Sequence, residues 1–181
     1  MTSDPPGPGP WQAGMVRRVP RRWLNLAGFL VCLGLLAYGY YLQTVRGLQP
    51  CPLCIMQRVA FMGLGLVFLM AAVHNPRRWG RYLYAVLLLL IAGAGAGVAI
   101  RHVYLQHLPP EMAPSCGPGL SYILQNFSPG RAIPLILRGS GECAAIHWRF
   151  LGLTIPGWSL VMFVLLGIAG VVRNALPGPA R

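Results

Sequence analysis

Four long apolar stretches constrain what this chain can fold into more than any other feature of its sequence. They cover approximately residues 24–42, 55–73, 82–100 and 151–172. Each is close to the ~20 residues that an α-helix needs to cross the hydrocarbon core of a bilayer. Because backbone polar groups inside lipid must be satisfied within the protein, segments of this kind are expected to be helical. We therefore expect an all-α membrane protein, a bundle of four transmembrane helices.

The composition agrees with a membrane protein and argues against a nucleic-acid binder. Only 10% of the residues are charged and 55% are hydrophobic, whereas a soluble domain has roughly 25% charged residues. The formal net charge is +12, and all 15 basic residues are arginine. A nucleic-acid binder would collect them on one polar face. Here they lie at the ends of apolar stretches, so the expected partner is the lipid bilayer and not a nucleic acid.

The distribution of arginine predicts the orientation of the bundle. Nine arginines lie before the first apolar stretch, between the second and third, and after the fourth, and five lie in the longer connections on the other side. Because positively charged loops tend to stay in the cytoplasm, both termini are expected to be cytoplasmic. Residues 43–50 and 102–150 then form two periplasmic loops. Residues 1–20, rich in proline and glycine, are expected to be a disordered cytoplasmic tail, and residues 21–175 the transmembrane domain.

Two shorter patterns add detail to this arrangement. Residues 120–127 and 133–137 are apolar but too short to span, so at least one of them is expected to lie flat at the membrane interface. In the third stretch, the spacing of Gly93 and Gly97 would permit a neighbouring helix to approach closely. An equally good interpretation is that glycine is simply frequent in membrane helices.

The five cysteines are sorted by this topology. Cys32 lies in the middle of the first helix and is expected to be a packing residue. The other four lie on or beside the expected outer face, where disulfides persist. Two disulfides among four cysteines allow three pairings, and adjacency favours Cys51–Cys54 and Cys116–Cys143.

Cys51 and Cys54 form a C-x-x-C motif at the start of the second helix. The positive end of the helix dipole favours the thiolate there, which is the reactive form of the side chain. So short a disulfide loop adds little stability, which argues against a purely structural role. No metal is expected, because two further ligands at zinc-finger spacing are absent, and Ile55 in place of histidine excludes a c-type haem. A redox-active disulfide is the favoured interpretation.

The second pair, Cys116 and Cys143, would close a loop of about 27 residues rich in proline and glycine. Spacing alone favours a structural staple and an exchange centre equally. A neighbouring C-x-x-C motif makes a relay by thiol–disulfide exchange the preferred hypothesis.

Three polar residues accompany the C-x-x-C motif. Arg58 lies one turn beyond Cys54 inside an apolar stretch, where a charge is costly and indicates function, although it could also extend toward the interface. We expect it to stabilise a Cys54 thiolate and to donate hydrogen bonds to an acceptor that gains negative charge. His102 and Gln106 lie one turn apart at the outer end of the third helix. They could donate hydrogen bonds or relay protons near neutral pH. Taken alone, however, the pair is weak evidence, and His102 is more typical of an ordinary histidine at the membrane interface.

Oxidation of a dithiol releases two electrons and two protons, which the side chains present cannot accept, so a cofactor is required. No haem, flavin or iron–sulfur spacing is visible. A lipid-soluble quinone fits the position, and the residues indicate a membrane thiol oxidoreductase.

The motifs together resemble the bacterial disulfide bond formation protein B (DsbB) family. They are CPLCIMQR at residues 51–58, HVYLQ at 102–106, PSC at 114–116, GEC at 141–143 and the segment 148–158. The resemblance covers roughly residues 21–173. The long arginine-, proline- and glycine-rich tail and Cys32 fall outside the family's pattern.

The resemblance implies an enzyme of the bacterial inner membrane, a protein-disulfide:quinone oxidoreductase. A periplasmic DsbA-like protein of the thioredoxin fold would attack Cys116 of the Cys116–Cys143 pair, and Cys51–Cys54 would take the electrons over. Cys54 would reduce a quinone, ubiquinone or menaquinone, held near Arg58 with His102 and Gln106 close by. The quinol then feeds the respiratory chain.

Three alternatives are considered at this stage. One is a DsbI-type oxidase of the same chemistry that serves a specialised partner. A second is a non-enzymatic membrane protein whose disulfides are structural staples. A third is a nucleic-acid or acidic-lipid binder that uses the net charge of +12, but its arginines would have to cluster on one soluble face, and in the sequence they do not.

Overall fold

The structure, a computed structural model, describes residues 20–76, 79–109, 120–146 and 148–175. The predicted tail before residue 20 and Cys116 lie outside the described residues.

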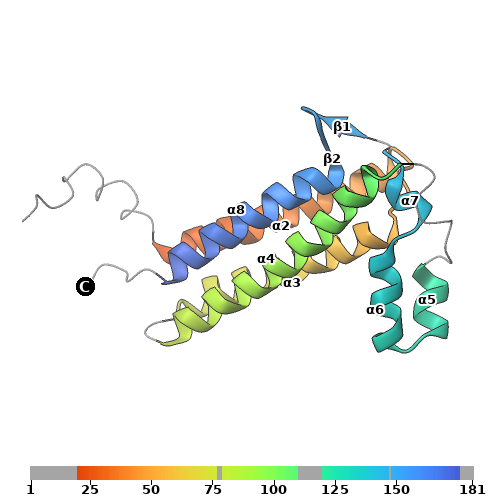
Figure 1. Cartoon of the computed structure of the whole chain (residues 1–181). Helices are drawn as coiled ribbons and strands as arrows, with labels where there is room; N and C mark the ends of the chain where they lie inside the picture. Colours follow the sequence, from red (N-terminus) through yellow and green to blue (C-terminus); the bar gives the residue numbers. More distant parts are fainter. Residues whose placement is uncertain (1–19, 77–78, 110–119, 147, 176–181) are drawn as a thin grey trace, which may run out of the picture.

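Four long helices form an antiparallel bundle (Figure 1). They are α2 (Arg21–Thr44), α3 (Pro52–His74), α4 (Trp79–Gln106) and α8 (Ile155–Ala175), and all are long and apolar enough to cross a membrane. The predicted all-α class with four transmembrane helices is confirmed. The start of α2, the end of α3, the start of α4 and the end of α8 lie together at one end, called the arginine end below. The other end carries Cys51 and Cys54 and is called the cysteine end.

The centre of the bundle is packed around an aromatic pair. The rings of Phe61 and Phe163 stack with centroids 4.0 Å apart, and the Phe163 ring lies directly against the backbone of Gly95 on α4. A Cβ atom at Gly95 would collide with that ring, so glycine permits the close approach of α4 and α8. The predicted Gly93 and Gly97 face open space instead. Of the two interpretations of these glycines, close helix approach is therefore not supported, because the side of α4 that meets α8 is set by tertiary packing.

Cys32 has the role predicted for it. Its side chain is buried in the core, and its Cβ packs against Gly65 of α3.

Short helices and a hairpin cover the cysteine end. They are α5 (Leu120–Asn126), α6 (Pro129–Arg138), α7 (Gly141–Ala144), β1 (Arg149–Phe150) and β2 (Leu153–Thr154). The two apolar pieces of the long loop thus form helices, which pack on each other through Ile123, Ala132 and Ile136. The strands pair antiparallel around Leu151 and Gly152, both at positive φ, as in the tightest hairpin turns. Because this hairpin comes first, α8 begins only at Ile155.

Candidate active site

The C-x-x-C motif folds as the capped start of α3. Cys51 is the N-cap residue, and its sulfur accepts a hydrogen bond from the backbone N–H of Cys54 at 3.4 Å. Pro52 occupies the first turn, where its missing N–H is not needed. Cys51 is buried and Cys54 is half-buried. Both sulfurs therefore lie at the positive end of the helix dipole, as predicted.

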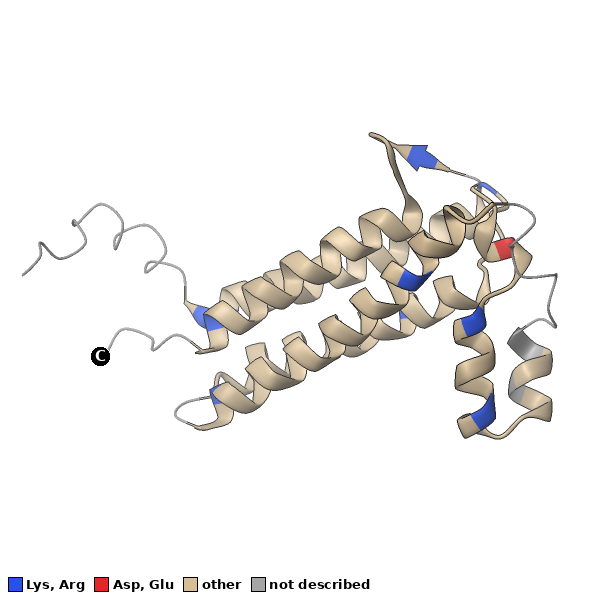
Figure 2. Ribbon diagram, viewed as in Figure 1, with Lys and Arg blue, Asp and Glu red and all other residues tan. Residues whose placement is uncertain are grey.

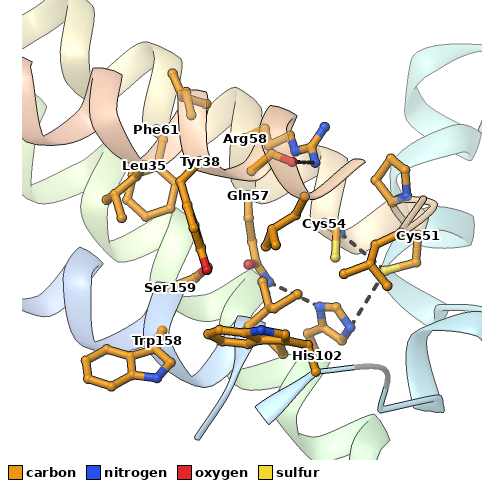
Figure 3. A pocket seen from close by; sticks show the side chains of 18 of the residues that line it. Leu35, Tyr38, Cys51, Cys54, Gln57, Arg58, Phe61, His102, Trp158 and Ser159 are labelled. Atoms are coloured by element: carbon orange, nitrogen blue, oxygen red, sulfur yellow. Dashed lines mark hydrogen bonds between the residues drawn. The ribbon is translucent and has the colours of Figure 1, made fainter. Parts of the chain in front are cut away.

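His102 reaches Cys51 from the C-terminal end of α4. Its Nε2 lies 3.7 Å from the Cys51 sulfur, and its Nδ1 lies 3.3 Å from the amide nitrogen of Gln57 (Figure 3). The Gln57 N–H donates to Nδ1, so the neutral ring carries its proton on Nε2 and directs it at the sulfur. His102 and Gln57 are both 3% exposed. His102 is thus not an ordinary interfacial side chain, because it completes a buried chain of hydrogen bonds between α3 and α4.

Sequence reasoning missed Gln57. A signal was present, since this amide lies in an apolar helix, three residues after Cys54 and beside Arg58. A buried amide needs a hydrogen-bond partner, which made it a candidate for a polar contact.

Cys143 lies against Cys51 although the two are far apart in the sequence. It is fully buried on α7 in a cluster with Cys51, Leu53 and Leu105. The pKa of the Cys143 thiol is raised well above its ordinary value. The largest cause is hydrogen bonding to the Cys51 sulfur, and burial is the second. The described cysteines are all thiols here. The predicted partner of Cys143, Cys116, lies outside the described residues.

Arg58 is held against α2. Its Nη1 donates to the side-chain oxygen of Gln43 at 2.7 Å, and its Nη2 donates to the backbone oxygen of Gly39 at 2.9 Å. These bonds fix the guanidinium between two helices in the partly buried zone next to Cys54. Gln43 is a second residue that sequence reasoning missed, because nothing in the sequence indicated which face of α2 meets Arg58.

A cavity of about 420 Å³ opens beside the C-x-x-C motif. Its size is within the roughly 300–1,000 Å³ of small-molecule sites. Its walls are largely apolar. Five of the predicted site residues line it: Cys51, Cys54, Arg58, His102 and Gln106. The Gln106 side-chain oxygen accepts a hydrogen bond from the Thr154 hydroxyl at 2.8 Å, which ties α4 to the hairpin.

Aromatic rings form one side of this cavity. Tyr38, Trp148, Phe150 and Trp158 all line it, and the Trp148 ring stacks on Phe150 with centroids 5.9 Å apart. The Trp158 indole N–H donates to the backbone oxygen of Phe150, which fastens the hairpin to α8. Flat aromatic faces of this kind suit a planar ring ligand.

Cys51, Cys54 and His102 are also arranged as metal ligands. Their sulfur and nitrogen atoms all lie within 4.8 Å of one another. Two thiolates and one imidazole are a ligand set used for zinc with an open position. This arrangement could not be predicted from the sequence, because His102 lies on another helix and its distance along the chain from Cys51 and Cys54 does not match zinc-finger spacing.

The family is settled by comparison with known proteins. The model of the family "Disulfide bond formation protein DsbB" matches residues 21–173. The chain belongs to the DsbB family. The family member of Nitrosococcus oceani, "Disulfide bond formation protein B", is 50% identical over 161 residues, covering 89% of this chain and 95% of the relative. Its counterpart in Marinobacter nauticus is 49% identical over 150 residues, covering 83% and 89%. That of Methylococcus capsulatus is 50% identical over 148 residues, covering 82% and 90%.

Membership in the DsbB family establishes the function in outline. The chain is a multi-pass inner-membrane protein and a protein-disulfide:quinone oxidoreductase that serves disulfide bond formation by reoxidising DsbA. The alternative of a non-enzymatic protein with structural disulfides is thereby excluded.

Proposed function

We propose that electrons pass from a periplasmic DsbA-like protein through Cys116–Cys143 and Cys51–Cys54 to a quinone bound beside Cys54. The observation that carries this proposal is the position of Cys51, which contacts Cys143 on one side and shares the cavity wall with Cys54 and Arg58 on the other. One sulfur thus connects the protein-facing and the quinone-facing parts of the site.

The relay begins at Cys116. A partner thiolate attacks the Cys116 sulfur, the Cys116–Cys143 bond breaks, and Cys143 leaves as a thiolate. The Cys143 thiolate attacks Cys51, which forms Cys51–Cys143 and releases Cys54 as a thiolate. The packing of Cys143 on Cys51 supports this step.

Two further exchanges complete the transfer. The second partner thiolate attacks its own cysteine in the mixed disulfide, which releases an oxidised partner and a Cys116 thiolate. The Cys116 thiolate attacks Cys143, restores Cys116–Cys143 and releases Cys51 as a thiolate. Two electrons now reside on Cys51 and Cys54. His102 assists the last step, because its Nε2–H, oriented by Gln57, can donate to the Cys51 thiolate as it leaves.

The cavity fits a quinone in size, in its apolar walls and in its aromatic side. When bound, ubiquinone or menaquinone supplies the two-electron acceptor and leaves as a quinol after taking up two electrons and two protons. Arg58 provides positive charge beside Cys54 and a donor for a ring oxygen. Because Thr154 holds the Gln106 side chain by its oxygen, the NH₂ group of Gln106 is the end that can donate to a bound ring.

The proposal is tested by following both ends of the relay at once. The purified protein is supplied with a reduced DsbA-like partner and with a ubiquinone or a menaquinone analogue, and quinone absorbance and partner thiols are recorded together. We expect one quinone reduced per partner disulfide formed. Cys54→Ser should abolish quinone reduction, whereas the matched core variant Cys32→Ala should retain it. Failure of both quinones, or an active Cys54→Ser, would contradict the proposal.

A further inference from the structure

Three arginines from three helices meet at the arginine end of the bundle. Arg21 begins α2, Arg81 lies in the first turn of α4, and Arg173 lies in the last turn of α8. Arg21 is close enough to both Arg81 and Arg173 for their charges to repel. Glu142, the one acidic residue in the described part of the chain, lies at the opposite end (Figure 2). The fold thus concentrates positive charge here.

A buried amide pair joins α2 to α8 beside Arg21 and Arg173. The side-chain amides of Asn25 and Asn174 donate to each other's oxygens at 3.3 and 3.1 Å, and both residues are buried. Asn25 lies one turn after Arg21 on the same face of α2, and Asn174 directly follows Arg173. Interhelical hydrogen bonds between amides fasten helices in lipid. Arg21 and Arg173 are therefore kept close by the fold despite their repulsion.

Arg81 carries an N–H group that is ready for an acceptor. Its Nη2 donates to the Tyr82 hydroxyl at 2.6 Å, and its guanidinium lies 4.5 Å from the centroid of the Tyr82 ring. Its Nε atom is buried and has no hydrogen-bond partner among the described residues. A buried donor without an acceptor is costly, and an anionic oxygen placed among the three arginines would satisfy it.

The surroundings of the cluster indicate that this anion belongs to a lipid. Trp23 and Trp79, at the same end of the bundle, are 61% and 88% exposed. Exposed tryptophans at helix ends mark the level of lipid headgroups. Leu83, one turn further into the bilayer than Trp79, is also exposed and offers an apolar surface for an acyl chain.

We propose that Arg21, Arg81 and Arg173 form a binding site for the phosphate of an anionic phospholipid. Guanidinium groups bind phosphate oxygens through paired, charge-assisted hydrogen bonds, and basic pockets between transmembrane helices bind lipid headgroups. The charge pattern of the sequence predicts that this end is cytoplasmic. The site lies at the end of the bundle opposite the cysteines and is independent of the redox reaction.

The test uses the full chain in detergent, titrated with phosphatidylglycerol or phosphatidylcholine, and counts retained lipids by native mass spectrometry. We expect selective retention of phosphatidylglycerol. Arg81→Gln and Arg173→Gln should each lower the affinity for phosphatidylglycerol about fivefold, which is the effect of one arginine near an anionic surface. Arg22→Gln is the matched control, because Arg22 is the exposed neighbour of Arg21 and its loss removes the same charge. Its affinity should change less than twofold.

Further measurements guard against misfolding and against a site for free anions. Arg81→Lys keeps a charge but loses the Nε–H group, and we expect it to bind phosphatidylglycerol more weakly than the parent chain while quinone reduction continues. Inorganic phosphate should not raise the thermal midpoint as the lipid does. Equal weakening by Arg22→Gln, equal retention of phosphatidylcholine, full binding by Arg81→Lys, or equal stabilisation by inorganic phosphate would each overturn the proposal.

Discussion

The amide nitrogen of Gln57 lies 3.3 Å from Nδ1 of His102, and this contact determines what the other ring nitrogen does. With Nδ1 accepting, Nε2 carries the proton and faces the Cys51 sulfur at 3.7 Å. The Gln57 amide thus determines that His102 directs its N–H group at the Cys51 sulfur. A buried chain of this kind connects α3 to α4 where the two helices enclose the cavity.

Gln57→Leu should slow the reactions of Cys51, because His102 loses the partner that orients it. We expect about a fivefold lower alkylation rate of Cys51 in the reduced protein, the value of one hydrogen bond of about 1 kcal/mol. Gln57→Asn keeps the amide on a shorter side chain, and its alkylation rate should lie between those of Gln57→Leu and the parent protein. Met56→Leu, the neighbouring position that packs on the α5–α6 pair, is the control. An unchanged rate in Gln57→Leu would assign the amide to packing alone.

The contact between Cys143 and Cys51 predicts a disulfide between them. A variant that keeps only these two cysteines, with Cys32, Cys54 and Cys116 changed to alanine, should form the bond under mild oxidation. Peptide mass mapping would detect it. A variant that keeps Cys32 and Cys143 is the control and should stay reduced, since Cys32 lies in the core of the bundle. A fully reduced Cys51/Cys143 variant would refute the exchange step proposed above.

The raised pKa of Cys143 has a defined effect on pH dependence. Its largest cause is hydrogen bonding to the Cys51 sulfur, so the reduced fold favours the neutral thiol. This stabilisation is fully present below the pH range in which ordinary thiols titrate, near pH 8.5, and is lost as pH rises above that range. Thermal unfolding of the reduced protein should therefore show a midpoint that falls with pH above about 8.5. In Cys51→Ala the decline should be smaller, and an identical pH profile would contradict the assigned cause.

Gln43 and Gly39 position Arg58, so disturbing them should affect the quinone and not the thiol partner. Arg58→Ala should raise the apparent KM for quinone and lower turnover. Gln43→Leu should reduce kcat/KM for quinone about tenfold, the lower range for a hydrogen bond to a charged group. The KM for the reduced partner should change little in both. Arg46→Ala, which removes an exposed arginine at the same end of the bundle, is the control. If Gln43→Leu leaves the quinone parameters unchanged, Arg58 does not depend on α2 for its position.

The parts of the structure that were predictable from the sequence are those set by local chemistry. The four helices follow from apolar length, because lipid leaves such segments no other way to satisfy their backbone. The proximity of Cys51, Cys54 and Arg58 follows from helical spacing. By contrast, the contacts of His102 with Cys51 and of Arg58 with Gln43 depend on which helix faces meet.

The same limit explains the remaining differences. Gly95 and not Gly93 meets the neighbouring helix because the rotation of α4 is set by the large ring of Phe163. Cys143 reaches Cys51 through the path of α7, which a loop rich in proline and glycine does not reveal. Hydrophobic periodicity is uninformative in these helices, since lipid-facing and buried sides are equally apolar.

The cluster of Cys51, Cys54 and His102 predicts that soft divalent metals bind the reduced enzyme. The three ligand atoms lie within 4.8 Å of one another, and thiolate and imidazole ligands favour zinc. Coordination through Nε2 requires the His102 proton to move to Nδ1, where the side-chain oxygen of Gln57 accepts it once the amide turns over. Formation of the Cys51–Cys54 disulfide removes both thiolates, so binding should occur only in the reduced state. We expect one Zn²⁺ per reduced chain by metal analysis, loss of quinone reduction, and full recovery with a chelator. His102→Ala should weaken binding about tenfold, or ~1.4 kcal/mol, whereas His107→Ala, an exposed histidine one residue beyond the end of α4, should not. Equal binding by the oxidised protein would show that the metal occupies another site.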